Sequence, residues 1–156
     1  MKYILVIISC IAFIGCTPKT VPQHQDIAYQ RNGQVRFIQS EGSALYFESI
    51  NIGSTSSEAV YHSVVSTIEN ILFKGIPKSP SEVPMISDEN KAMEAHGLAL
   101  KKIIYETGPN QFVTSSSILE EEKIANGIRS VVEVAIDTKA LRRELEKQSI
   151  IPKLGL

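Results

Sequence analysis

The sequence has no tryptophan, only two cysteines and no large excess of either sign of charge. With 16 basic and 17 acidic residues its formal net charge is −1, which disfavours nucleic acid as a partner because no positive field would hold a phosphate backbone. Two cysteines are too few for a disulfide-rich scaffold or a four-cysteine zinc site. An apolar fraction of 43% excludes a disordered acidic chain, and 156 residues are consistent with one folded domain.

One long apolar run lies at the N-terminus. Residues 3–14 follow Lys2 without a charge, and the run is too short for a bilayer core, which takes about 20 helical residues. The pattern is typical of a secretory signal peptide, predicted over residues 1–15. Its end, Phe13-Ile14-Gly15-Cys16, resembles the lipobox of bacterial lipoproteins, in which the cysteine thiol takes a diacylglyceryl group and becomes the mature N-terminus.

This resemblance implies a lipid anchor on Cys16, and an ordinary secretory signal with an incidental cysteine is the alternative. Cys10 is a poorer candidate, because only about seven apolar residues precede it. If Cys10 leaves with the signal and Cys16 is acylated, no thiol remains for catalysis, a disulfide or a metal.

Residues 16–33 are predicted to be the lipidated cysteine and a flexible tether, because they contain prolines and glutamines without a periodic apolar pattern. No acidic run follows Cys16 directly. Such a run resembles the surface-export signal of Bacteroidetes lipoproteins, and its absence favours an outer-membrane location facing the periplasm. The anchor predicts the membrane as a partner, and an envelope protein is the candidate second partner.

Alternating apolar and polar residues predict strands from Gln34 onward, the first secure one spanning residues 44–52. Later, Asn126-Gly127 separates two apolar segments and predicts a hairpin with a type I′ turn, in which both residues need positive φ. In the second arm, residues 128–136, alternation predicts one apolar and one solvated face.

Three helices are expected from their N-terminal caps. Thr55 to Glu58 has the spacing of a capping box, before one apolar stripe that runs to about Lys74-Gly75. Ser87-Asp88 begins a second helix that should end at residues 107–109, and Asp137 begins the last. The order of elements predicts a single α+β domain over residues 34–156, a two-layer sandwich with helices on one face of a mainly antiparallel sheet.

Four short segments carry a resemblance to a known family, namely residues 69–77, 83–85, 111–113 and 140–146. They resemble a family of small Bacteroidetes envelope proteins of uncharacterised function, and the resemblance covers residues 44–156. More distantly, the strand ending in Gly53, the capped helix after it and the late hairpin resemble the small α/β domain of flagellar T-ring proteins and some surface lipoproteins. Both resemblances imply a fold, and neither supplies a catalytic residue.

The histidines give weak signals for chemistry. His24 lies in the tether, and His62 lies one turn after Glu58 but about 200° around the helix from Val60, which favours a solvated face. His96 lies near the apolar stripe of its helix, where a partly buried, hydrogen-bonded structural role is favoured over a general base.

The serines and glutamates later in the chain are expected to be exposed to solvent rather than to act in catalysis or metal binding. Residues 115–117 lack the surroundings of a nucleophile elbow, and residues 120–122 on a strand can converge at most two carboxylates. The turn Gly53-Ser54 at a helix N-terminus could bind an anion, but it lacks the lysine and second glycine of a phosphate loop, and a plain helix cap is favoured. We expect no metal and no cofactor.

Three hypotheses follow. The first is a non-enzymatic envelope lipoprotein that acts as an interaction or assembly module. The second is an envelope module that binds a small ligand or glycan, with Gly53, Ser54 and His96 as candidate binding residues. The third, an enzyme, would need His62 or His96 to meet a carboxylate in a pocket.

Overall fold

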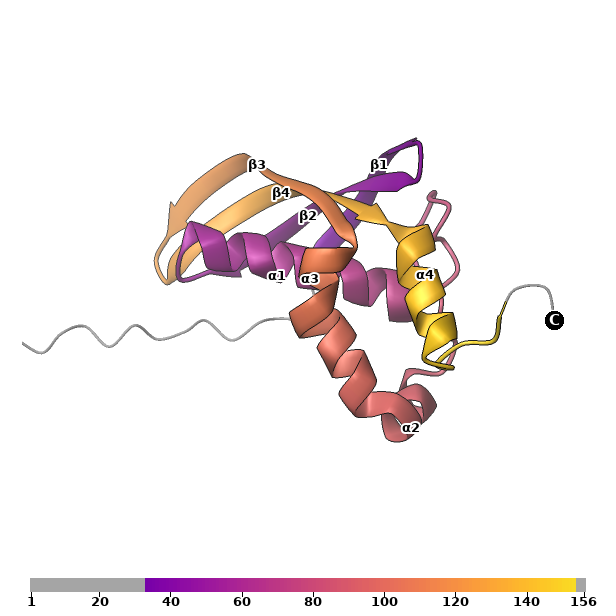
Figure 1. Ribbon diagram of the computed structural model, residues 1–156. Helices are drawn as coiled ribbons and strands as arrows, with labels where there is room; N and C mark the ends of the chain where they lie inside the picture. Colours follow the sequence, from indigo (N-terminus) through magenta and orange to yellow (C-terminus); the bar gives the residue numbers. More distant parts are fainter. Residues whose placement is uncertain (1–32, 154–156) are drawn as a thin grey trace, which may run out of the picture.

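The computed structural model of the protein describes residues 33–153, which form a four-stranded antiparallel sheet with helices on one face (Figure 1). The strands are β1 (Gln34–Glu41), β2 (Ala44–Gly53), β3 (Val113–Ile124) and β4 (Gly127–Asp137), in the spatial order β1-β2-β4-β3. The expected two-layer α+β architecture is confirmed. The predicted signal peptide and Cys16 lie outside the described residues.

The helical layer contains three main helices. Three short helical segments extend the first two of them: one follows the first helix and two follow the second. The helices are α1 (Ser56–Glu69), α2 (Glu89–Lys101), α3 (Gly108–Gln111) and α4 (Thr138–Lys147), with π-helical turns η1 (Asn70–Lys74) after α1 and η2 (Lys102–Thr107) after α2. The three predicted caps are confirmed: the side chains of Thr55, Asp88 and Asp137 accept hydrogen bonds of 3.2, 3.0 and 2.9 Å from backbone N–H groups of the first turns. Each cap satisfies a donor that has no partner within its helix.

The predicted end of the second helix at residues 107–109 is wrong. The chain continues as α3 to Gln111, because Gly108 keeps right-handed helical geometry at φ −60° and ψ −47°. Pro109 stands near the start of α3, where the fixed φ of its ring fits helical geometry.

The late hairpin is confirmed, but its predicted turn is wrong. Ile124 pairs with Gly127, so the two-residue loop is Ala125-Asn126, one position earlier than expected. Gly127 has φ 150°, whereas Lys78 and Ser149 are the only described non-glycine residues with positive φ. Asn126 therefore does not adopt the left-handed conformation of a type I′ turn.

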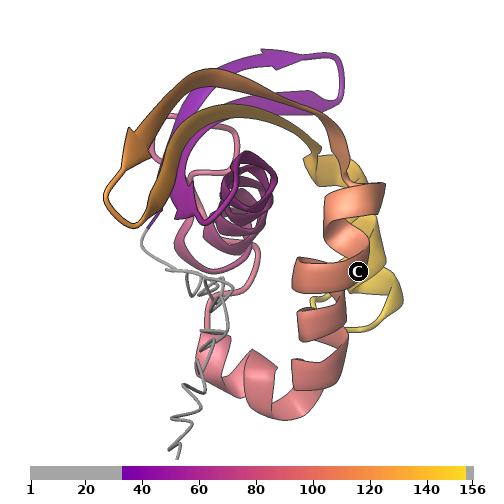
Figure 2. The ribbon, with the colours of Figure 1, turned by 90° about the vertical axis from the view of Figure 1, so that its left-hand side faces the viewer.

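Helix α1 is buried far beyond the single stripe that its periodicity predicts. All residues from His62 to Glu69 are buried. The sheet curves over one side of α1. The continuous helical segment formed by α2, η2 and α3 runs along another side of α1 (Figure 2). The core joins these layers, and its fully buried members include Phe47, Val65, Ile68, Ile71, Leu72, Leu100, Ile103, Val132, Val134, Ile136, Leu141 and Leu145.

The face of the sheet opposite α1 is only partly solvated. Arg129 and Glu133 lie on this face, as expected, but Val131 and Ala135 on the same face are 7% and 0% exposed. The reason is that β4 is a central strand, so side chains of β2 and β3 cover it from both sides.

Candidate functional site

The turn before α1 brings Gly53 and Ser54 against the start of the helix. A Cβ on Gly53 would lie 2.3 Å from the backbone nitrogen of Ala59, so only glycine fits. The N–H of Ser54 donates a 2.6 Å hydrogen bond to Oε2 of Glu58, and the Ser54 hydroxyl bonds to the same oxygen. Both donors of Ser54, its N–H and its hydroxyl, are thus already bonded to a carboxylate of the chain, and a binding role for Gly53 and Ser54 stays a prediction.

His62 is not on a solvated face, and that expectation is wrong. His62 is 5% exposed, and Nδ1 of its imidazole lies 2.7 Å from the backbone oxygen of Ile52 at the end of β2. Because a carbonyl oxygen only accepts, the Nδ1–H of His62 is the donor. Nε2 lies 3.9 Å from Oε1 of Glu58, so the imidazole sits between the sheet and the cap of α1.

A layer of small polar side chains lies between α1 and the sheet, and sequence reasoning missed it. α1 packs on β2 and β4, and the small polar residues Ser63 and Ser66 of α1, Ser49 and Asn51 of β2 and Ser130 of β4 are all at most 6% exposed. Asn51 donates a 3.2 Å hydrogen bond to Ser49, whereas the hydroxyls of Ser63, Ser66 and Ser130 have no partner in the described part of the chain. The available signals were the three-residue spacing on α1 and the two-residue spacing on β2.

Two tyrosines connect α1 to η2. The Tyr61 hydroxyl donates to the backbone oxygen of Tyr105, and the Tyr105 hydroxyl donates to Oε1 of buried Glu69, both at 2.9 Å. Burial, followed by the negative charge of Glu106, raises the pKa of Tyr61. The Tyr61 phenol therefore keeps its proton and acts as a structural donor at neutral pH.

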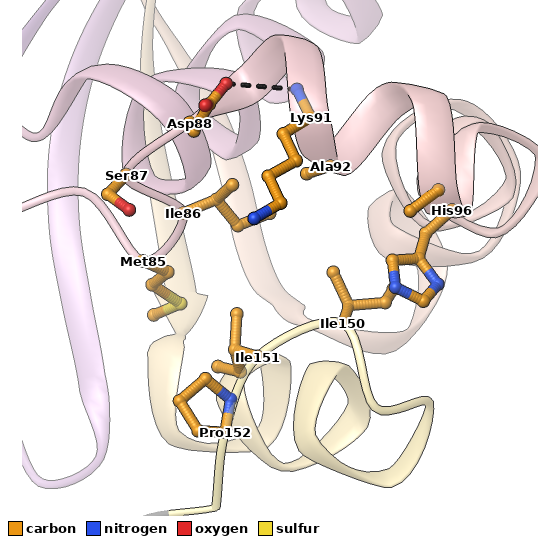
Figure 3. A pocket seen from close by; sticks show the side chains of 11 residues that line it. Met85, Ile86, Ser87, Asp88, Lys91, Ala92, His96, Ile150, Ile151 and Pro152 are labelled. Carbon is orange, nitrogen blue, oxygen red and sulfur yellow. Dashed lines mark hydrogen bonds between the residues drawn. The ribbon is translucent and has the colours of Figure 1, made fainter.

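A cavity of about 240 Å³ lies where α2, the loop before it and the segment after α4 meet (Figure 3). His96 lines it, at a position where α2 departs from helical geometry with φ −133° and ψ 20°. His96 is partly buried, as expected, and its side chain makes no hydrogen bond among residues 33–153, so the expected hydrogen-bonded structural role stays a prediction. A residue held off the helical conformation beside a cavity is a candidate for binding.

Strand β3 carries the serines and glutamates that were expected to be exposed, and they are. Glu122 lies 4.0 Å from Arg129, an exposed ion pair of small energetic value. Within residues 33–153 no three His, Cys, Asp or Glu side chains come together in a way that could hold a metal ion.

In the same described part, no helix is both long and apolar enough to cross a bilayer. Comparison of the chain with protein-family models, with curated proteins and with solved structures finds no match. The resemblances to envelope and T-ring proteins therefore stay predictions.

Proposed function

We propose that the protein is a membrane-tethered lipoprotein of the bacterial cell envelope, whose α+β domain acts as a non-enzymatic interaction or assembly module. The observation that carries the proposal is Phe13-Ile14-Gly15-Cys16 at the end of an uncharged apolar run. Several acyl chains on Cys16 would make attachment stable, because each buried CH₂ is worth about 0.8 kcal/mol and one chain alone is marginal. The proposed location is the outer membrane, facing the periplasm.

The tether and the folded domain fit this arrangement. Fifteen residues from Thr17 to Arg31 span up to about 50 Å when extended, enough to hold the domain clear of lipid headgroups. The domain offers a partner the free edge of the sheet at β3, where Ile118 and Leu119 are 44% and 49% exposed. Unpaired backbone groups of an edge strand, with apolar side chains beside them, support recognition of a protein.

The anchor is tested by replacing Cys16 with alanine in the full chain and following incorporation of labelled palmitate and sedimentation with membranes. We expect Cys16→Ala to abolish both, while the matched control Cys10→Ala retains them. If Cys16→Ala is still labelled and still sediments with membranes, the lipoprotein proposal is wrong.

The interaction role is tested by placing a photo-crosslinking amino acid at Leu119 in cells that contain the anchored protein. We expect a discrete adduct from Leu119 and none from exposed Val83, which lies in the loop between η1 and α2. Equal labelling from the two positions, or none from Leu119, would contradict a specific contact at β3.

The alternative function, a small-ligand or glycan-binding envelope module, has one observation in its favour. The cavity beside His96 combines buried apolar residues with polar side chains that have no partner among the described residues. This combination is characteristic of small-molecule sites.

A further inference from the structure

The cavity beside His96 is built from three segments that are distant in the sequence. Residues 85–88 form one wall, the helix face from Lys91 to His96 forms the second, and residues 150–152 close the third (Figure 3). Ile86 and Ile151 are 6% and 7% exposed and belong to the hydrophobic core. The cavity therefore has a rigid apolar floor that is continuous with the core.

The polar groups all lie on or just before α2. The carboxylate of Asp88 accepts a 3.0 Å hydrogen bond from the backbone N–H of Lys91, which places its charge against the positive end of the helix dipole. The side chains of Lys91 and His96 make no hydrogen bond or ion pair among residues 33–153. Lys91 extends toward Ile86, and the His96 imidazole points toward Ile150 (Figure 3).

Lys91 and His96 therefore present to the cavity side-chain donors that have no partner among residues 33–153, beside the apolar side chains of Ile86 and Ile151. The Lys91 ammonium is cationic, and an imidazole supplies at least one N–H donor in either tautomer. A carboxylate could accept from both and leave an attached apolar group on Ile86 and Ile151. A purely apolar ligand would leave both donors unused, and Lys91 would repel a cation, whereas the Asp88 carboxylate that would attract one is already bonded to the backbone N–H of Lys91.

The size of the cavity limits the ligand. A volume of about 240 Å³ holds about eight water molecules at about 30 Å³ each, which corresponds to roughly eight heavy atoms. A six-carbon straight-chain carboxylate has that size, whereas a lipid or an oligosaccharide is far larger.

We propose that this cavity binds a small aliphatic monocarboxylate, with its carboxylate at Lys91 and His96 and its chain on Ile86 and Ile151. The proposal deepens the alternative, ligand-binding function and rests on it. It does not depend on the lipid anchor, because loss of lipidation in Cys16→Ala would leave these residues in place.

The methionines provide a direct probe. Met85 lines the cavity, whereas Met93 lies on the same helix as Lys91 but outside the cavity. The full chain, held in phosphatidylcholine nanodiscs and labelled with ¹³C at the methionine methyl groups, is titrated with hexanoate. We expect a saturable shift of the Met85 signal and little change at Met93. Hexylamine and 1-hexanol, with the same chain, should shift Met85 much less at equal concentration.

Variants identify the binding groups. Lys91→Met and His96→Gln should each weaken hexanoate binding by about threefold to tenfold, the usual effect of removing one partly exposed charge or donor. Lys102→Met, a matched change of an exposed lysine outside the cavity, should leave binding unchanged. Ala95→Phe should fill the cavity and abolish the Met85 shift without removing a polar group.

Three results would overturn the proposal. One is an unmoved Met85 signal in a chain that keeps its native spectrum. The second is an equal response to hexylamine or hexanol, and the third is unchanged hexanoate binding in Lys91→Met and Ala95→Phe. The first two would also remove the support for the ligand-binding alternative at this cavity, whereas the palmitate test of Cys16 would be unaffected.

Discussion

Nδ1 of His62 lies 2.7 Å from the backbone oxygen of Ile52, and this hydrogen bond joins the first turns of α1 to the end of β2. The imidazole is buried, so its N–H could not exchange this acceptor for bulk water without moving the helix. The contact therefore fixes where α1 starts against the sheet, and it assigns to His62 a structural role.

Replacing His62 with leucine should lower the free energy of unfolding by about 1 kcal/mol or more, because a side chain of similar size loses the hydrogen bond to Ile52. His96→Leu is the matched control and should change stability by less than about 0.5 kcal/mol, since His96 is partly exposed and makes no hydrogen bond among the described residues. Urea unfolding monitored by circular dichroism measures both. Equal effects in the two variants would contradict the structural role of His62.

The carboxylate of Glu58 occupies the N-terminus of α1 through its bonds to Ser54. Glu58→Ala should cost about 1 kcal/mol, as the loss of a helix cap does. It should also free the Ser54 donors, so that phosphate stabilises Glu58→Ala more than the unchanged protein when compared with chloride at equal ionic strength. Thermal unfolding in the two salts measures this. Marked stabilisation of the unchanged protein by phosphate would instead support an anion site at Gly53 and Ser54.

Local signals in the sequence predicted where three helices begin, and the structure explains why. Thr55, Asp88 and Asp137 act on N–H groups within a few residues, so the information for a cap is contained in one short segment. The late hairpin was predicted for the same reason. Its loop shifted by one residue because the pairing of Ile124 with Gly127 depends on the whole length of β3 and β4.

Features that arise from packing were not predictable in this way. The periodicity of α1 gives one apolar stripe, but burial from His62 to Glu69 depends on a second flank supplied by η2 and α3. The cavity beside His96 needs residues 85–88 and 150–152 to meet, which no local pattern encodes. Sequence reasoning selected His96, but it gave no reason to connect it with Lys91.

The hydroxyl of Ser63 is buried between α1 and the sheet without a partner in the described part of the chain. Ser63→Ala should raise the free energy of unfolding by about 1 kcal/mol, because the desolvation cost of the hydroxyl disappears and alanine is the better helix former. Ser57→Ala, at an exposed position on the same helix, isolates the second effect. Chemical denaturation of both variants gives the difference. A loss of stability in Ser63→Ala would show that the hydroxyl has a partner, such as a buried water.

Tyr46 lies on the face of the sheet opposite α1, close to two carboxylates. The negative charge of Glu41 is the main cause that raises the pKa of Tyr46, followed by burial, a hydrogen bond with Glu41 and the charge of Glu133. A negative neighbour disfavours the phenolate, so removing it should move the pKa down toward that of a free tyrosine. Glu41→Gln should therefore lower the Tyr46 pKa, and Glu133→Gln should lower it less. Titration of the ¹³Cζ signal of Tyr46 by NMR measures both shifts, and a larger effect from Glu133→Gln would contradict the assignment of Glu41 as the dominant neighbour.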